Sequence, residues 1–345
     1  MSTVDQAPPV APYIQDIHLQ PQSLARLLDA GLPRDVRKLL KSAGQFDRVV
    51  MTGMGSSLFA LHPTFLRLAE AGLPVWNIET SELLGGARSL ITANTLLWVT
   101  SQSGQTPEVL ALLDSLPVTP EVVFGVTNDA SSPMASSCHH VLELHSGDEK
   151  TVSTRSYLNT LAASALAVGA ILDQPEDQEL AGAPDKLSEW LQDWPAHLAH
   201  IDSLLPPATT FILGRGASLA ATRTGSLIIK EASGTPVEGM SVAAFRHGPL
   251  EMAGPDLSVL LLAGAPSEHR LNEDMRDDLT HHGARVAWID TSSGQDGIRM
   301  PDLRGDIARP IAEFLPFEAL SVVLAHRRGR EPGSFTKIGK VSSRL

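Results

Sequence analysis

The chain contains a single cysteine, Cys138, among its 345 residues. One thiol excludes a disulfide within the chain, a CxxC redox pair and a cysteine-based structural zinc site. It fits a reducing compartment, since disulfides persist mainly in oxidising ones. The N-terminus also lacks a basic segment followed by an apolar core, which argues against a signal peptide. We therefore expect a cytoplasmic protein.

Basic residues, aromatic residues and long apolar runs are also scarce. Lys and Arg total 27 against 39 Asp and Glu, which gives a formal net charge of −12, and aromatic residues make up 5%. Nucleic-acid binding draws on a basic face, and a membrane span needs about 18 consecutive apolar residues. Neither nucleic acid nor a membrane is expected as a partner. Hydrophobic residues nevertheless reach 43%, so the chain should fold, with a length that suggests about two domains.

Short β-rich runs alternate with loops and with apolar residues at helical spacing. This repetition predicts an α/β fold in which parallel sheets are flanked by helices, a three-layer, flavodoxin-like arrangement. The predicted strands are 48–53, 95–100, 122–127, 210–214, 257–262 and 284–289. The predicted helices are two short ones after Tyr13, separated around Gly31–Pro33, and longer ones at 154–172, 187–205 and from about 219 to 233.

Two segments about 160 residues apart are alike, VVMTGMGSS at 49–57 and TFILGRGAS at 210–218. They indicate two copies of one architecture, joined by the polar, acidic segment 173–185. We expect an N-terminal arm and helices at 1–45, with the arm itself at 1–11. A first domain at 46–180, a second at 181–327 and a C-terminal tail at 328–345 follow.

Each glycine loop of the repeat comes where a strand leads into a helix, where backbone N–H groups and the helix dipole favour an anion. Gly53 and Gly55 permit a tight turn and close approach of a ligand. A dinucleotide site would need GxGxxG, but the third glycine is replaced by Leu58 in the first loop and Leu219 in the second. A nicotinamide cofactor is therefore disfavoured, and no cofactor is expected.

The segment SQSGQTPE at 101–108 is more distinctive. Ser101, Ser103 and Thr106 offer hydroxyl donors, and Gly104 lets the chain turn. Thr106 and Pro107 suit the cap and first position of a helix. Together they form a neutral phosphate cradle, although a serine-rich connection before an ordinary helix start would look similar. The nucleotide-binding P-loop pattern GxxxxGK[ST] is absent.

Glu231 and His247 are the candidate proton-transfer groups. A carboxylate and an imidazole near a phosphate cradle can move protons on a sugar when their surroundings tune them. Taken alone, Glu231 could instead be a solvated residue near a helix end, and His247 a turn residue before Gly248-Pro249. The adjacent pairs His139-His140 and His281-His282 are poorly placed to share a metal ion, because neighbouring strand residues point to opposite faces; no metal is predicted.

Several motifs in a fixed order resemble the tandem sugar isomerase (SIS) domain family. The chain is similar to the isomerase half of glucosamine-6-phosphate synthase and to amino-sugar-phosphate deaminase/isomerases. The match runs from about Tyr13 to the C-terminus. Its carriers are YIQDIHLQP, GMGSS, SQSGQT, GDEKTVSTR at 147–155, GRG, the KE pair at 230–231, FRHGP at 245–249 and RGREPGSFTK at 328–337.

The resemblance implies roles for individual residues. Glu231 matches the glutamate that carries a proton between C1 and C2, and His247 the histidine that opens the sugar ring of the neighbouring subunit in a homodimer. Lys337, five residues after Pro332, matches the tail lysine that can form a Schiff base with the ketose. The implied contacts to the phosphate and sugar are Gly55, Ser56, Ser57, Ser101, Gln102, Ser103, Gly104, Thr106, Glu149, Ser153 and Thr154.

The chain also departs from the synthase pattern. Ile228 stands where the synthase has a lysine, three residues before the catalytic glutamate, and the segment at 147–155 is one residue shorter. No glutaminase half accompanies the two domains, so ammonia supply from glutamine is not expected within this chain.

The expected function is that of a phosphosugar aldose–ketose isomerase or an amino-sugar-phosphate deaminase, and the preferred reaction converts glucosamine-6-phosphate to fructose-6-phosphate and ammonia. A deglycase for phosphorylated fructosamine adducts would use the same enolamine chemistry. A non-catalytic phosphosugar-binding regulator is the alternative from another class, although a sensor has no need of Glu231, His247 and Lys337 together. The expected partners are a small sugar phosphate and a second copy of the chain.

Overall fold

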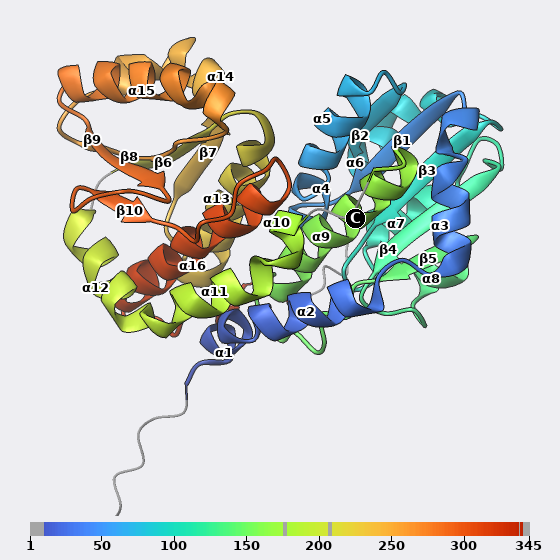
Figure 1. Cartoon of the computed structure of the whole chain (residues 1–345), viewed down its shortest axis with the longest axis horizontal. Helices are drawn as coiled ribbons and strands as arrows, with labels where there is room; N and C mark the ends of the chain where they lie inside the picture. Colours follow the sequence, from blue (N-terminus) through green and yellow to red (C-terminus); the bar gives the residue numbers. More distant parts are fainter. Residues whose placement is uncertain (1–9, 175–177, 206–208, 338, 341–345) are drawn as a thin grey trace, which may run out of the picture.

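The computed structural model describes residues 10–174, 178–205, 209–337 and 339–340. Most of the predicted arm, the middle of the predicted connection (175–177) and the end of the predicted tail (338 and 341–345) lie outside these residues. The described chain forms two parallel five-stranded sheets, each flanked by helices (Figure 1). The predicted fold class, two α/β domains of similar architecture, is confirmed.

The first sheet has the order β2-β1-β3-β4-β5, and the second has the order β10-β9-β8-β6-β7. The central strands match the predicted segments, whereas the four strands at the sheet edges were not predicted. The bounds are β1 (Arg48–Gly53), β2 (Val75–Glu79), β3 (Thr95–Thr100), β4 (Val122–Thr127) and β5 (His140–Glu143), then β6 (Thr209–Gly214), β7 (Val237–Ser241), β8 (Leu257–Leu262), β9 (Arg285–Asp290) and β10 (Gly297–Arg299).

Two predicted helices are each divided in the structure. The segment before Gly31 forms α1 (Pro12–His18) and α2 (Gln20–Ala30), followed by α3 (Arg34–Lys41). The segment predicted as one helix at 187–205 forms α11 (Ala183–Gln192) and α12 (Trp194–Leu204). In both places a proline occupies the start of the second helix, where it is well tolerated and cannot extend the helix before it.

The other helices alternate with the strands. In the first half they are α4 (Ser56–Phe59), α5 (His62–Glu70), α6 (Thr80–Glu82), α7 (Pro107–Asp114), α8 (Pro133–Ser136), α9 (Arg155–Ile171) and α10 (Gln178–Ala181). In the second half they are α13 (Leu219–Ser233), α14 (Val242–Arg246), α15 (Pro266–His281) and α16 (Ala308–Arg327). No helix in these described ranges is long and apolar enough to cross a membrane.

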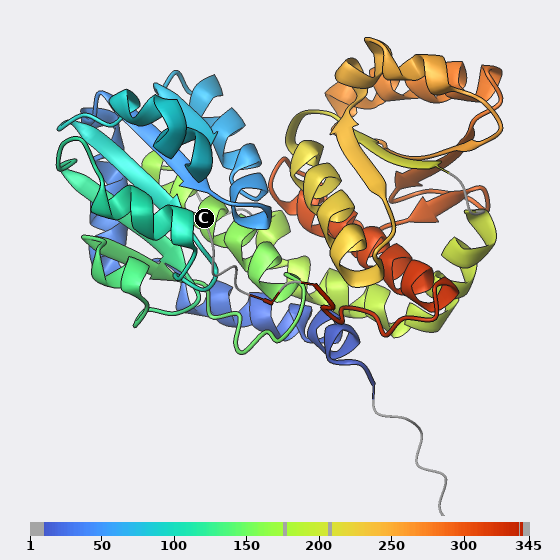
Figure 2. The ribbon, with the colours of Figure 1, turned by 180° about the vertical axis from the view of Figure 1, so that it is seen from behind.

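One continuous core joins the two halves. Side chains alternate across each strand, so Trp98 of β3 faces this shared core whereas Leu97 and Val99 face a separate outer core. Buried residues of α9, α13 and α16 belong to the shared core together with one face of each sheet, and Figure 2 shows these helices between the sheets. The two halves therefore share one hydrophobic core.

Helix α16 carries two buried carboxyl groups, Glu313 and Glu318. Burial raises the pKa of Glu313 to about 7, although the Ser218 hydroxyl that donates to it at 2.7 Å opposes the shift. Burial also raises the pKa of Glu318, which accepts a hydrogen bond of 2.5 Å from the Gln20 side chain. These contacts connect α16 to the second glycine loop and to the N-terminal helices.

Two glycine-to-alanine changes should alter the free energy of unfolding in opposite directions, because one glycine lies where α13 packs closely on α16 and the other does not. A methyl group on Gly225 would approach the buried Phe317 ring to 2.4 Å, whereas one on Gly169, in α9, would meet only a backbone oxygen at 3.8 Å. We expect Gly225→Ala to lower the free energy of unfolding by about 1–3 kcal/mol through overpacking. Gly169→Ala should raise it by roughly 0.5 kcal/mol through helix propensity. Urea unfolding of both variants measures this, and equal shifts would contradict the packing described.

Candidate functional site

Two loops at the carboxyl edge of the first sheet form the floor of the site. Gly55, between β1 and α4, has a φ of +51°, and Gly104, between β3 and α7, has a φ of +61°. Both values lie in the left-handed region that glycine adopts at little cost. Because the strands are parallel and adjacent, their carboxyl ends bring the two loops together. This edge is the usual ligand-binding place in open α/β sheets.

Two hydroxyl groups of the SQSGQT loop, those of Ser101 and Thr106, face each other. Ser101 Oγ and Thr106 Oγ1 are 2.7 Å apart, and the Gly104 N–H donates to Ser101 Oγ at 3.2 Å. Thr106 occupies the N-cap position of α7, as predicted, but its side chain makes no capping hydrogen bond. The expected cap was wrong in this respect, because the Thr106 hydroxyl pairs with Ser101 instead. The helix N-terminus thus remains open to a ligand.

A cavity of about 230 Å³ lies above these loops and reaches into the second half of the chain. All of the predicted phosphate and sugar contacts line it except Gly104 and Thr154. Gly104 lies against Ser132, where an added Cβ would fall 2.0 Å from the hydroxyl oxygen. The lining residues are Met54, Gly55, Ser56, Ser57, Ser101, Gln102, Ser103, Thr106, Glu149, Thr151, Val152, Ser153, Leu227, Glu231, Phe335 and Lys340.

Glu231 is the acid of the second half that lines this cavity. It lies in the last turn of α13, and burial raises its pKa to about 7, while the neighbouring Lys230 acts in the opposite direction. At that pKa the side chain can both accept and return a proton near neutral pH. Ile228 is fully buried one turn earlier, so the position at which the synthase has a lysine contributes no charge here.

Glu149, Ser153 and Thr154 come from the segment that precedes α9. Ser153 lines the cavity, whereas Thr154 is fully buried and donates through its hydroxyl to Glu149 Oε1 at 3.0 Å. Thr154 is therefore a neighbour of the site rather than part of its surface. Thr151, which was not predicted, lines the cavity with a buried hydroxyl oxygen that has no hydrogen-bond partner among the described residues.

The tail brings a lysine to the cavity, but not the expected one. Lys337 is exposed and does not line the cavity, whereas Lys340 does and lies 3.5 Å from Glu149 Oε2. Lys337 was expected here because its distance from Pro332 matches the family's tail lysine. In the structure the Gly333 N–H first donates to the Ala232 carbonyl at 3.1 Å, and Phe335 then lines the cavity. The second lysine of KIGK was the only sequence signal for Lys340.

Figure 2 shows the tail, in dark red, running from the end of α16 toward the first half of the chain. Gly333 has a φ of +77°, and an added Cβ would lie 2.5 Å from the Tyr13 Cβ atom. Only glycine suits both this conformation and this space. Tyr13 in turn pairs with Ser321 of α16 at 2.9 Å. The N-terminal helix therefore holds the tail beside the residue that follows Glu231.

His247 lies apart from this cavity in the described chain. It is exposed at the end of α14, directly before Gly248, and is not among the lining residues. Helix α14 packs on the outer core of the second sheet through Val242 and Phe245. A single copy of the chain thus brings the cradle, Glu231 and Lys340 together but leaves His247 at the surface.

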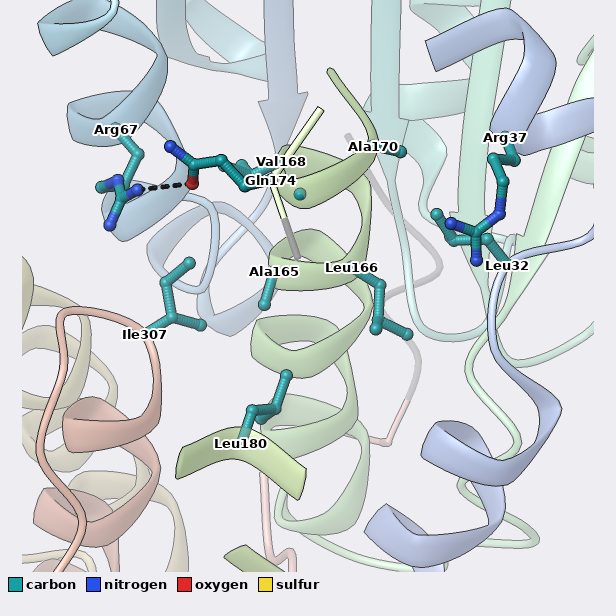
Figure 3. A pocket seen from close by; sticks show the side chains of 11 residues that line it. Leu32, Arg37, Arg67, Ala165, Leu166, Val168, Ala170, Gln174, Leu180 and Ile307 are labelled. Atoms are coloured by element: carbon teal, nitrogen blue, oxygen red, sulfur yellow. Dashed lines mark hydrogen bonds between the residues drawn. The ribbon is translucent and has the colours of Figure 1, made fainter. Parts of the chain in front are cut away.

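A second cavity, of about 80 Å³, lies near the opposite end of α9 (Figure 3). Its walls are mainly apolar, with Arg37 and Arg67 as the charged residues, and Arg67 donates to the Gln174 side chain at 2.8 Å. None of its described lining residues is a carboxylate, a hydroxyl or an imidazole group. It therefore has no acid–base pair, unlike the cavity that Glu231 lines.

Comparisons with known proteins agree with this architecture. The SIS domain family profile matches residues 45–170 and 203–321. A glutamine–fructose-6-phosphate aminotransferase (isomerizing) from Thermococcus kodakarensis is 26% identical over 349 residues, covering 95% of this chain and 57% of that protein. The chain thus spans little more than half the length of that relative.

Two solved structures share the fold across nearly the whole chain. Tagatose-6-phosphate ketose/aldose isomerase from Escherichia coli has a TM-score of 0.80 at 16% identity and covers 94% of this chain and 96% of its own. Glucosamine-6-phosphate deaminase from Thermotoga maritima has a TM-score of 0.70 at 18% identity and covers 94% and 97%. The two profile matches, one on each parallel sheet, show that the chain belongs to the SIS domain family.

Proposed function

We propose that the protein is an amino-sugar-phosphate deaminase of the aldose–ketose isomerase type, and that glucosamine-6-phosphate is its preferred substrate. One observation carries the proposal: a single cavity joins a neutral hydroxyl cradle to a glutamate whose pKa is raised to about 7. The cradle suits a phosphate, and the glutamate suits proton transfer on the sugar attached to it. The names of the similar proteins support the same class of substrate.

The cradle would hold the phosphate without a lysine. Ser101, Ser103 and Thr106 present hydroxyl groups at the open N-terminus of α7, where backbone N–H groups and the helix dipole favour an anion. Neutral donors that are already in place need no rearrangement when the anion arrives. The sugar would then extend from the cradle toward Glu231, which lines the same cavity.

Glu231 would carry the proton between adjacent carbons. In the open-chain aldehyde its carboxylate removes the C2 proton, forming an enolamine, and the resulting carboxylic acid returns that proton to C1. The product is an imine at C2. Water adds to this carbon and ammonia leaves, so one amino-sugar phosphate and one water become one ketose phosphate and one ammonia. A carboxyl group near neutral pKa serves both directions of this transfer.

Lys340 would stabilise the negative charge that develops during this step. It is the only described residue lining the cavity with a cationic side chain. When C2 loses its proton, charge accumulates on the C1 oxygen, and an ammonium group beside that oxygen lowers the barrier. Because Ile228 supplies no amine, this task falls to the tail rather than to α13.

Glu231→Gln should abolish turnover, because an amide cannot accept the C2 proton, while the affinity for the sugar phosphate stays within about tenfold since the cradle is intact. Ammonia and ketose phosphate release from glucosamine-6-phosphate measures turnover, and calorimetry measures binding. Release of an amino acid from a phosphorylated fructosamine adduct, with none of ammonia, would favour a deglycase. Binding without turnover in the unaltered protein would favour a regulator.

The raised pKa of Glu231 gives kcat/KM an expected pH dependence. The base is the carboxylate, so activity should rise with pH through about 7 and level off above it. Below that value, kcat/KM should fall about tenfold per pH unit as Glu231 becomes protonated. A pH series of initial rates at low substrate tests this. If the pH profile of kcat/KM instead rose with a midpoint near the ordinary pKa of glutamate, the proton transfer would belong to another group.

The exposed position of His247 supports its donation to the site of a second copy, where it would open the sugar ring. Mixing Glu231→Gln with His247→Ala subunits then leaves one site of each mixed dimer with both native groups. We expect each variant alone to be nearly inactive and the mixture, after subunit exchange, to regain a substantial part of the activity. No recovery in mixed dimers demonstrated by mass spectrometry would place His247 in the site of its own chain or outside the reaction.

A further inference from the structure

The Glu149 carboxylate is fully buried between helix α9 and the tail. Oε1 accepts hydrogen bonds from the Thr154 N–H at 2.8 Å, the Thr154 hydroxyl at 3.0 Å and the Ser156 N–H at 3.1 Å. Oε2 accepts one from the Ser156 hydroxyl at 2.7 Å and faces Lys340 Nζ at 3.5 Å. Oε1 therefore accepts hydrogen bonds from the start of α9, and Oε2 connects that helix to the tail.

The negative charge of the buried Glu149 carboxylate is stabilised from two sides, by the start of helix α9 and by the ammonium of Lys340. A carboxylate at a helix N-terminus is stabilised by the unpaired N–H groups and the helix dipole. The ammonium of Lys340 adds a charge-assisted contact in a poorly solvated place. Two other acids lie within electrostatic reach of Glu149, but Asp16 is already paired with Arg155 at 2.6 Å and Glu318 accepts a hydrogen bond from Gln20. Glu149 is therefore the carboxylate available to Lys340.

Lys340 needs such a partner to have a defined position. Its side chain has a flexible four-carbon stem and loses substantial rotamer entropy when the ammonium is held in one position. The last backbone hydrogen bonds before it in the described tail are those of Gly333 and Ser334, whose N–H groups donate to the Ala232 and Glu331 carbonyls. Among the described residues of the tail after Ser334, the contact with Glu149 is the hydrogen bond that orients the ammonium. Without Glu149, the lysine would sample many positions over the cavity.

We propose that Glu149 is a positioning residue that holds the Lys340 ammonium in the cavity that Glu231 also lines. The resemblance implied that Glu149 contacts the sugar, but its two oxygens are already occupied by α9 and Lys340. Its contribution to the reaction rests on the proposed function, because it acts through Lys340. The placement of Lys340 by Glu149 is independent of the proposed function, so placement and reaction can be measured separately.

Glu149→Gln separates the two sides of the carboxylate. The amide oxygen can keep the hydrogen bonds at the Oε1 position, and the amide nitrogen can donate to the Ser156 hydroxyl at the Oε2 position. That nitrogen cannot accept from Lys340. The variant should therefore keep α9 capped while releasing the tail lysine. Glu121→Gln, at an exposed position in the first half, is the matched control.

Competitive acetylation of the folded full chain, read by mass spectrometry, measures the placement of Lys340 directly. The exposed Lys337 of the same peptide region is the internal reference. We expect Glu149→Gln to raise the labelling rate of Lys340 relative to Lys337 at least threefold, and Glu121→Gln to leave the ratio unchanged. An unchanged ratio in Glu149→Gln would overturn the proposal, whatever the activity of the protein.

Kinetics then test the consequence for the reaction. Glu149→Gln should lower kcat by roughly tenfold to hundredfold through misplacement of the ammonium, with KM changed less than threefold. Lys340→Met should lower kcat at least as much, and the double variant no further than Lys340→Met alone. A raised KM and additive losses would show a structural role instead and overturn positioning. Increased labelling with no effect of either variant on kcat would refute the role of Lys340 in the proposed function but leave its placement by Glu149 intact.

Discussion

Burial of both faces of two parallel sheets is the constraint on which the rest of the structure depends. A parallel sheet needs helices on each side, and here the inner faces of both sheets share α9, α13 and α16 in one core. Helix α9 begins beside the carboxyl edge of the first sheet, and α13 ends near the same place. The shared layer therefore determines that a loop of one half and a glutamate of the other border one cavity.

The two halves of the chain are alike in topology but differ in what they contribute. The first supplies a cradle of hydroxyl groups without a cation, whereas the second supplies Glu231 in surroundings that keep it partly protonated near neutral pH. The tail adds Lys340 and, through Glu149, connects to the start of α9. In the proposed reaction, binding and proton transfer thus depend on separate elements, which allows one to change without loss of the other.

Much of this arrangement could be predicted from the sequence, for identifiable reasons. The central strands are continuous apolar runs such as Leu96–Val99, because they are buried on both faces. The four unpredicted strands all lie at sheet edges, where polar residues interrupt the pattern, as in the Val-Glu-Gly-Met-Ser run of β7. The loops after central strands were predictable from their glycine and hydroxyl residues. The positions of Lys340 and Thr151 were not, because they depend on the path of a loop and a tail over surfaces made by distant segments.

The tail completes the lining of the cavity, whereas the two sheets and the buried core do not depend on it. A chain cleaved between Arg328, which follows α16, and Phe335 would retain both sheets and the buried side chains of the shared core, since the last of these lie in α16. It would lose Phe335 and Lys340 from the cavity and expose Tyr13, on which Gly333 rests. A single cut in this short segment would therefore remove part of the lining of the cavity while leaving both sheets folded.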